Sequence, residues 1–461
     1  MTPFSDLLWL DDAAKDALLR EQAAVIARQA EQIGQLIERV AELEGRLSQP
    51  PKTPGNSSLP PSVGRKPSQG DGGKDKTRRR KKGRPGSFRE LCANPSRTVD
   101  LRVDCCPHCR SDLSQAPQRL CEAYDHIDVP PVGPVVTRIH LHGGDCPGCG
   151  KFLKAAPPAD MASGSPFGEN LRALVIYLRH TQGIGFERLR RLLDDLFGLA
   201  ISEGALINMT KAAADPFATQ VECIRERLLG HDVIASDETG MRVGKRNFWL
   251  WVFHHHDSAV FRIDPSRSKH VPEEFLAGHR PQFWLSDRYG AQKGFATKGH
   301  QFCLAHLIRD AQYAVDAGDD CFAPGLIVLF KRACRIGRRR QQLSDKELRF
   351  YHRKYVKKLS EILRLKPSHA EGCALQKSIA KIRANLFLFL LNRALDATNN
   401  GSERALRPCV TFRKITNGFR TSWGARFYAD VRSVIETARR RAIPILQAIR
   451  MTLNAQPLQP R

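Results

Sequence analysis

The sequence lacks a long hydrophobic run and a segment that would direct the chain to a membrane. Its longest apolar run is Leu386–Leu391, six residues, whereas a helix that spans a bilayer needs about 20. The first residues, MTPFSDLLWLDDAAKD, contain neither a basic region nor a long apolar region, so no secretory signal is visible. We therefore expect no membrane partner.

The sequence also lacks a regular cysteine framework. Its 13 cysteines are an odd number scattered over 461 residues, which argues against a set of structural disulfides and favours a reducing, cytoplasmic compartment. Aromatic residues make up only 7% of the chain, but 41% of it is hydrophobic. The chain is therefore long and apolar enough for several folded domains, with about three as the prior.

Positive charge is abundant. Lys and Arg number 73 against 48 Asp and Glu, a net charge of +25. Almost all of the excess lies in residues 74–84 (net +7), 331–358 (net +10) and 403–441 (net +7). Such concentrated charge predicts a polyanionic partner, and nucleic acid is the commonest one. An anionic membrane surface is the alternative.

Residues 1–48 are predicted to form a coiled-coil arm. Apolar residues repeat every seven positions from Leu19 through Ile26, Ile33 and Val40, a pattern that favours a two-stranded coiled coil and hence a homo-oligomer. Gln22 and Gln29 occupy the earlier d positions, so pairing is weaker there. An amphipathic helix packed on its own protein is the alternative.

Residues 49–90 read as a disordered basic linker, because Pro, Gly, Ser and charged residues cannot supply a core. The basic run ends in KGRPG, which resembles a minor-groove binding motif, although non-specific phosphate contact explains it better. The residues expected to contact DNA here are Arg78, Arg79, Arg80, Lys81, Lys82 and Arg84.

Residues 91–160 contain two Cys-Pro-x-Cys knuckles and are predicted to bind structural Zn²⁺. Two such knuckles supply four thiolates, which complete a tetrahedral site. The expected ligands are Cys106, Cys109, Cys146 and Cys149, with a strand over 135–142 that delivers the second knuckle. Other residues offer substitute ligands: Cys105, His108, Cys121, His140 and His142.

Residues 161–230 are predicted to be helical. Gly198 suits the end of one helix and Ser202 the cap of the next, which begins at Glu203. A helix, a short turn and a capped helix outline a helix-turn-helix that would bind DNA. Generic helical packing explains the pattern equally well.

Residues 231–425 are predicted to form an α/β catalytic domain. Strands are expected at 233–237, 247–253, 259–263, 283–287 and 301–304, with a helix at 269–278 before the fourth strand. This order is that of the ribonuclease H-like fold. Residues 305–396 form a helical insertion and residues 426–461 a C-terminal helical tail, so the whole chain is a multidomain α+β protein.

Two of these strands end in Ser-Asp, at Asp237 and Asp287. A carboxylate at the end of a buried strand is costly unless it binds a cation or hydrogen-bond donors. Mg²⁺ is typically held by one or two carboxylates together with phosphate oxygens and water. Strand-end aspartates that cap turns are the alternative for either residue alone.

A third carboxylate is expected on a downstream helix that Asn399 or Asn400 caps and Pro408 ends. Glu403 lies in its first turn, where negative charge is also favourable by itself. Arg404, Arg407, Arg413 and Lys414 follow it.

These motifs together resemble a DDE transposase of the insertion sequence 66 family of bacterial mobile elements. The matching stretches run along essentially the whole chain: NSSLPPS, CPHC, CPGC, ERLRRLLDDLFGLAISEGAL, SDETGMRV, SDRYG, CLAHLIRD, NNGSERALRP and SVIETARRRAIPILQAI. Singly, SDRYG would be a weak signal, but the ordered set is highly specific.

The resemblance implies that Asp237, Asp287 and Glu403 hold two Mg²⁺ or Mn²⁺ ions. Water would then attack a phosphodiester at the element end, and the freed 3′-hydroxyl would attack target DNA. Cys303, His306 and Arg309 belong to a motif beside these strands; His306 either assists the site or is a core histidine. The resemblance also implies a bacterial, nucleoid-associated protein helped by small accessory proteins of the same element.

The double-stranded DNA of the element ends and of the target would contact the zinc module, the helical region and the basic segments. The basic residues expected to contribute there are Arg309, Arg338, Arg339, Arg340, Arg404, Arg407, Arg413 and Lys414.

Two alternatives to an active transposase stay open. One is a ribonuclease H-like nuclease that cuts DNA without joining it. The other is a zinc-containing DNA-binding protein with an idle catalytic domain, such as an element repressor or a recruited relic.

Overall fold

The computed structural model describes residues 11–47, 49–57, 89–158, 161 and 166–459. These residues divide into two compact units: one spans 1–66, 157–189 and 203–461, and the other 67–156 and 190–202. The larger unit combines many helices with a five-stranded mixed sheet, so the chain has the expected α+β character. None of the described helices is long and apolar enough to cross a membrane.

The N-terminal arm is one helix, α1 (Asp12–Leu47). It begins seven residues before the heptad pattern, and its apolar repeat is exposed: Leu19, Ile26 and Ile33 are 62%, 65% and 56% accessible. The predicted helix is therefore confirmed, whereas its pairing with a second copy stays a prediction.

Residues 51–57 fold into a turn rather than the expected structureless linker. Asn56 is 5% exposed; its side-chain amide donates to Asp316 Oδ2 (2.8 Å) and to the Pro51 carbonyl (3.2 Å), and its Oδ1 accepts from the Thr53 N–H (2.6 Å). A side chain so fully bonded holds its segment in place. The expectation of a disordered linker is therefore wrong for these residues; the basic run at 74–84 lies outside the described residues.

Four helices precede the sheet, as predicted: α2 (Glu169–His180), α3 (Phe186–Phe197), α4 (Glu203–Ala212) and α5 (Ala214–Leu229). Gly198 ends α3 in the left-handed region (φ 61°), and its N–H bonds the Asp194 carbonyl. Ile176 of α2 and Phe217 of α5 share a hydrophobic core with Ile234 and Trp251 of the sheet. These two helices therefore belong to the same folded body as the sheet, while the helix-turn-helix stays a prediction.

The sheet has the strand order β5-β4-β3-β6-β7. Strands β3 (Val233–Val243), β4 (Arg246–His254) and β5 (Ala259–Asp264) are antiparallel, and β6 (Phe283–Ser286) and β7 (Gly299–Phe302) run parallel to β3. Helix α6 (His270–Leu276) precedes β6, as expected. The last strand begins and ends two residues earlier than predicted, because Cys303 is the N-cap of the next helix.

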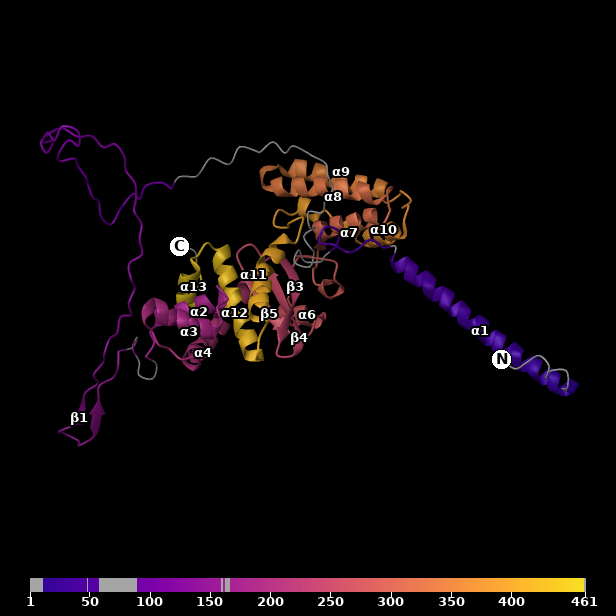
Figure 1. Cartoon of the computed structure of the whole chain (residues 1–461), viewed down its shortest axis with the longest axis horizontal. Coiled ribbons are helices and arrows are strands. Elements are labelled where there is room, and N and C mark those ends of the chain that lie inside the picture. The colour runs from indigo at the N-terminus through magenta and orange to yellow at the C-terminus, as the bar shows by residue number, and fades with distance from the viewer. Residues whose placement is uncertain (1–10, 48, 58–88, 159–160, 162–165, 460–461) are drawn as a thin grey trace. The chain divides into compact units, whose positions relative to one another are not determined.

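Helices α11 (Asn400–Thr416) and α12 (Ser422–Arg440) pack on this sheet (Figure 1). Leu406 and Phe412 of α11 share a core with Leu250 and Val252 of β4. The predicted end of α11 at Pro408 is wrong, because the helix continues for eight more residues. Pro408 is exposed, so the carbonyl that its missing N–H leaves unbonded can bind water.

Residues 426–461 are helical, as expected, although α12 already begins at Ser422 and covers an edge of the sheet. Strand β5 has a partner on one side only, and its free N–H groups at Ala259 and Phe261 donate to Thr437 (3.1 Å) and Ser433 (2.8 Å) of α12. Side-chain hydroxyls thus satisfy an edge that would otherwise be open to pairing. Helix α13 (Ile445–Leu453) follows and contributes Ile449 to the core.

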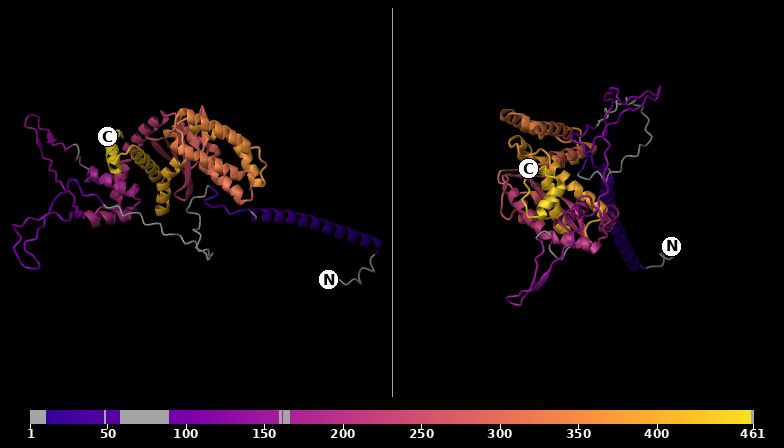
Figure 2. Two further views of the ribbon diagram at one scale, coloured as in Figure 1. Left: turned by 90° about the horizontal axis from the view of Figure 1, so that it is seen from above. Right: turned by 90° about the vertical axis from the view of Figure 1, so that its left-hand side faces the viewer.

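The insertion between β7 and α11 is helical, as predicted. Its helices are α7 (Leu304–Asp316), α8 (Ala323–Arg339), α9 (Asp345–Ile362) and α10 (Ala370–Ile382), which gather beside the sheet (Figure 2). They enclose their own core around Leu307, Phe330 and Leu359. Short 3₁₀ turns lie at 290–292, 340–342, 383–385 and 388–390.

The smaller unit contains one hairpin, β1 (Gly143–Asp145) with β2 (Phe152–Lys154), around the second cysteine knuckle. The strand predicted over 135–142 is wrong, since no described residue pairs with that segment as a strand partner. The apolar side chains of this segment are not buried either: Val135 and Val136 are 95% and 84% exposed.

Candidate active site

Asp237 lies within β3, and Asp287 directly follows the neighbouring parallel strand β6. The last pair in the β3–β6 register is Ala235 with Leu285, so each aspartate lies two residues further along the chain. The side chains of Ala235 and Leu285 contact the core of the insertion. The charge of Asp287 acts on Asp237, so the two carboxylates belong to one cluster.

Asp237 has more negative charge around it than its hydrogen bonds neutralise. Its Oδ1 accepts from the Glu238 N–H (2.9 Å). Burial, followed by the charges of Glu238, Asp287 and Glu403, raises its pKa well above the ordinary value of 3.8. A bound cation would remove this penalty, so the site has the electrostatics of a metal centre.

Glu403 comes to the same place from the first turn of α11. Its Oε1 lies 3.8 Å from His306 Nε2 and 3.6 Å from an Arg309 nitrogen, both on α7. The N-termini of α7 and α11 meet here, since the Leu304 N–H bonds the Ala397 carbonyl (3.0 Å). Helix N-termini favour negative charge, which helps to hold the carboxylates beside the starts of α7 and α11.

His306 is largely enclosed. Burial lowers its pKa, against the opposing effect of Asp287 and Glu403. Its Nδ1 is buried and has no hydrogen-bond partner among the residues that the structure describes. The neighbouring Cys303 thiol is also buried, which raises its pKa to about 12, so it stays protonated and is a poor metal ligand.

Asn399 joins the helix of Glu403 to the strand of Asp237, a long-range role that no sequence pattern indicated. It is 1% exposed; its side-chain amide donates to the Ser236 carbonyl on β3 (2.8 Å), and its backbone N–H donates to Cys303 Sγ (3.1 Å). Its Oδ1 accepts from Ser402 Oγ (2.6 Å), which also bonds His254 (2.8 Å). A local capping pattern had suggested Asn399, but its side chain makes no cap hydrogen bond.

Glu238, next to Asp237, was also missed. Its side chain is 1% exposed and pairs with Arg267 at 2.8–2.9 Å. The Arg267 guanidinium lies over the rings of Trp249 (4.4 Å) and Tyr289 (4.0 Å). Arg267 thus holds the Glu238 side chain, while burial and the charge of Asp287 still raise the pKa of this carboxyl.

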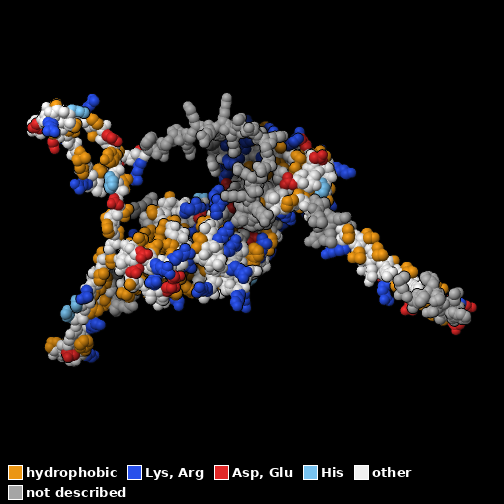
Figure 3. All heavy atoms as spheres, in the orientation of Figure 1, with side chains coloured by type: hydrophobic (Ala, Val, Ile, Leu, Met, Phe, Trp, Pro, Cys, Tyr) orange, Lys and Arg blue, Asp and Glu red, His pale blue; other side chains and the backbone are white. Residues whose placement is uncertain are grey.

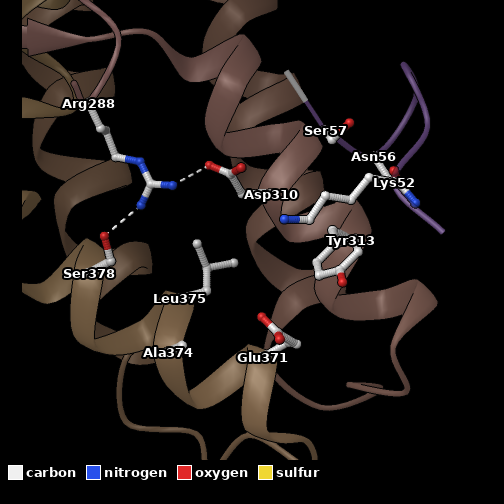
Figure 4. Close-up of a pocket in the computed structure, with 10 residues that line it drawn as sticks. All are labelled: Lys52, Asn56, Ser57, Arg288, Asp310, Tyr313, Glu371, Ala374, Leu375 and Ser378. Atoms are coloured by element: carbon white, nitrogen blue, oxygen red, sulfur yellow. Dashed lines mark hydrogen bonds and ion pairs between the residues drawn. The ribbon is translucent and has the colours of Figure 1, made fainter. Parts of the chain in front are cut away.

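Arg288, which follows Asp287, ties the end of β6 to the insertion. It bonds Asp310 of α7 and Ser378 of α10, both at 2.5 Å (Figure 4). It also lines a cavity of about 550 Å³, to which Lys52 and Asn56 of the N-terminal turn contribute. The turn at 51–57 and the strand of Asp287 are thus connected through α7.

The predicted DNA contacts fall into two groups. Arg404, Arg407 and Lys414 are exposed on α11, and Arg338 and Arg339 are exposed at the end of α8; Lys and Arg side chains gather over α11 and α12 in Figure 3. Three others are bound within the protein. Arg340 pairs with Asp396 and Arg413 bonds the Gly240 carbonyl, so we no longer expect these two arginines to contact DNA. Arg309 faces Glu403. The predicted contacts at 78–84 lie outside the described residues.

The two cysteine knuckles have the same backbone geometry. In each, the N–H of the residue after the second cysteine bonds the first cysteine's carbonyl (Arg110 to Cys106, 2.9 Å; Gly150 to Cys146, 2.8 Å), with φ near +65° at that residue (62° and 68°). Hydrogen bonds from Ser111 lower the pKa of Cys109 to about 7. Backbone N–H groups of Gly148 and Cys149 lower that of Cys146. Both turns thus favour the thiolate, the metal-binding form.

The structure does not bring the two knuckles together, however. Within the described part of the chain, one group alone places three ligand atoms within 4.8 Å of one another: His231, His255 and Asp257. Neither the four cysteines nor the three carboxylates form such a group. The expected four-thiolate arrangement is therefore not assembled, and the carboxylates are spaced more widely than around one ion.

The fold and the site define a mixed α+β protein whose sheet presents carboxylates from two parallel strands and a distant helix. The profile of the transposase IS66 family matches residues 164–427, more than half of the chain. The chain belongs to this family, as its motifs had indicated. No curated protein matches the sequence.

Proposed function

We propose that this protein is a transposase that cuts and joins double-stranded DNA at the ends of an insertion sequence, with Asp237, Asp287 and Glu403 as its metal-binding carboxylates. The observation that carries the proposal is the parallel pairing of β3 with β6, whose last register pair lies two residues before both Asp237 and Asp287 and so brings aspartates 50 residues apart into one cluster. Membership of the transposase IS66 family supports the reaction.

The proposal includes a ribonuclease H-like core. Three antiparallel strands followed by two strands parallel to the first, in the order 3-2-1-4-5, support it. So does the position of Glu403 on a helix that packs against β3 and β4. The insertion α7–α10 then separates the second carboxylate from the third in the chain but not in space.

An all-oxygen donor set fits Mg²⁺ or Mn²⁺. Two such ions would activate the attacking oxygen and stabilise the leaving one. The protein's own part is to hold the carboxylates: Arg288 fixes the chain directly after Asp287, Asn399 fixes α11 on β3, and Arg267 holds Glu238. Arg404 and Arg407, exposed beside Glu403, would contact phosphates of the bound DNA.

The decisive experiment compares wild type with Asp237→Ala on duplexes from the element's terminal repeats, in Mg²⁺ and in Mn²⁺. The variant is expected to bind these duplexes as wild type does and to lose DNA joining. Glu273→Gln, an exposed carboxylate on α6, is the matched control. Joining by Asp237→Ala would overturn the assignment of the catalytic carboxylate.

The same assay separates the two alternatives. A wild-type protein that cuts the duplex and never joins it is a nuclease. One that binds and does neither, in either metal, is an idle DNA-binding protein. The absence of terminal inverted repeats around the gene would favour this last reading.

We further propose that the two knuckles bind one structural Zn²⁺ when they come together. Their matching turns and lowered thiol pKa values support this. Metal analysis of the purified chain is expected to lose one zinc per chain after Cys106→Ser with Cys149→Ser, whereas Cys223→Ser, an exposed cysteine elsewhere, should lose none. Equal zinc contents in all three proteins would contradict the site.

The exposed heptad of α1 supports a homo-oligomer formed through that helix. Small accessory proteins of the same element and a place on the bacterial nucleoid remain part of this proposal through the family alone.

A further inference from the structure

A cluster of histidines lies at the start of β3, several residues before Asp237. His231 precedes β3, and His255, His256 and Asp257 form the turn between β4 and β5. From Val233 to Asp237, strand β3 extends about 13 Å, so this cluster is separate from the proposed catalytic site.

The side chains of this cluster converge closely. His231 Nε2 lies 2.9 Å from Asp257 Oδ1, and the rings of His231 and His255 are 4.0 Å apart. One ligand atom from each of these three residues lies within 4.8 Å of the others. His256 adds a third imidazole, with its Nδ1 2.6 Å from Nδ1 of His255.

Burial, together with the neighbouring His231 and His256, lowers the pKa of His255 to about 3. Neutral imidazole is the form that binds transition metals. The cluster is also only half-buried, so an ion can reach it from solvent.

Arginines approach the cluster, but their donors are directed at other oxygens. Arg227 pairs with Asp257 Oδ2 (2.7 Å), and Arg441 donates to the Asp257 carbonyl (2.9 Å) and to Ser258 (3.1 Å). Arg440 donates to the His255 carbonyl. Asp257 Oδ1, which accepts from Ser258 (3.0 Å), is thus the carboxylate oxygen turned toward the histidines.

We propose that His231, His255 and Asp257 form a further metal site, which binds a borderline divalent ion of the Zn²⁺ class. Two imidazole nitrogens and one carboxylate oxygen are a common three-ligand set for zinc, with water or His256 in the fourth position. With bonds of about 2.0–2.1 Å, ligand atoms around a tetrahedral zinc lie about 3.3 Å apart. The distance of 2.9 Å between His231 Nε2 and Asp257 Oδ1 is close to this ligand-to-ligand distance.

Such an ion would join the segment between α5 and β3 to the β4–β5 turn. Arg440 and Arg441 already connect the end of α12 to the same turn. The ion would therefore fix three elements at the end of the sheet. This role is structural and does not depend on the DNA chemistry proposed above.

The test uses the full chain, stripped of metal and titrated with Co²⁺, whose absorption distinguishes sulfur from nitrogen and oxygen ligands. Wild type is expected to bind one ion more than His255→Ala or Asp257→Asn, and that ion should show no thiolate charge-transfer band. Any thiolate charge-transfer band from Co²⁺ bound at the cysteine knuckles should be the same in all three proteins. His279→Ala, an exposed histidine elsewhere in the same unit, should behave as wild type.

Zn²⁺ should also raise the melting temperature of wild type more than that of His255→Ala, while the two metal-free proteins melt within a few degrees of each other. Asp257→Asn preserves the side-chain shape and serves as the second variant where His255→Ala alters the metal-free protein. Equal Co²⁺ uptake by wild type and both variants would overturn the proposal.

Discussion

Strand β3 separates two clusters of different chemistry. At its start, His231 meets His255 and Asp257, and nitrogen donors predominate. Further along, Asp237 faces Asp287 and Glu403, and all the donors are oxygen. One strand thus presents donors of two kinds at two places, suited to different ions.

The two clusters also differ in how far the charge of their carboxylates is compensated by neighbouring groups. Arg227 and Ser258 partner the single carboxylate of the histidine cluster, which lowers the pKa of Asp257 despite its burial. The catalytic cluster holds several carboxylates, and the pKa of Asp237 is raised. An uncompensated buried charge is costly, so the catalytic end is the one that needs its ions for stability.

The largest expected effect is a change of metal preference at the oxygen end. Asp287→Cys should reduce joining by at least about 1,000-fold in Mg²⁺, because a thiolate is a poor ligand for that ion. Mn²⁺ accepts softer ligands and should restore part of the activity. Joining rates in the two metals measure this; equal loss in both would remove the evidence that Asp287 is a ligand.

The second effect concerns Asn399, a positioning residue. Asn399→Ala should slow joining about 10- to 100-fold, since small displacements of reacting groups are costly, and raise the Mg²⁺ concentration needed for half-maximal rate. It should also cost about 1–3 kcal/mol of folding stability. Asn400→Ala, its exposed neighbour, is the control. An unchanged Mg²⁺ requirement would reduce Asn399 to a purely structural role.

The third effect is on stability against pH. The folded-state pKa of Asp237 lies above its ordinary value of 3.8, so the folded chain holds this proton more tightly than the unfolded chain. Stability without Mg²⁺ should therefore fall as the pH rises through that raised pKa. Melting temperatures should show a larger gain from Mg²⁺ at pH 8 than at pH 5. Asp237→Asn should reduce this difference; an equal gain in wild type at both pH values would contradict it.

The smallest effect is on DNA affinity. Arg404→Ala and Arg407→Ala should each weaken binding uniformly across sequences and reduce the slope of log affinity against log salt by about 0.9. Arg280→Ala, exposed in the loop before β6, should leave the slope unchanged. Titrations at several salt concentrations provide the measurement. Loss confined to one DNA sequence would instead assign these arginines to base contacts.

Much of the fold could be predicted because its signals are local. The apolar strands that contain or precede the two Ser-Asp pairs, the helical insertion and the α1 heptad depend on residues that are neighbours in the chain. The predicted strand end at Asp237 is wrong, however, because β3 pairs with β4 as far as Val243. Predictions failed where distant contacts decide the outcome. Pro408 was expected to end α11, but packing of Leu406 and Phe412 on the sheet carries the helix past it. Residues 51–57 were expected to be disordered, but Asn56 bonds Asp316, 260 residues away.

The sequence by itself determined which residue types stand at each turn and strand end, including the two cysteine knuckles and the two aspartates, because local backbone preference and burial patterns are short-range properties. Tertiary structure alone decided that Glu403 meets Asp237 across 165 intervening residues, that Asn399 holds them there, and that His231 faces Asp257. These meetings depend on strand register and helix docking, which arise from burial of many apolar side chains at once and which no short segment encodes.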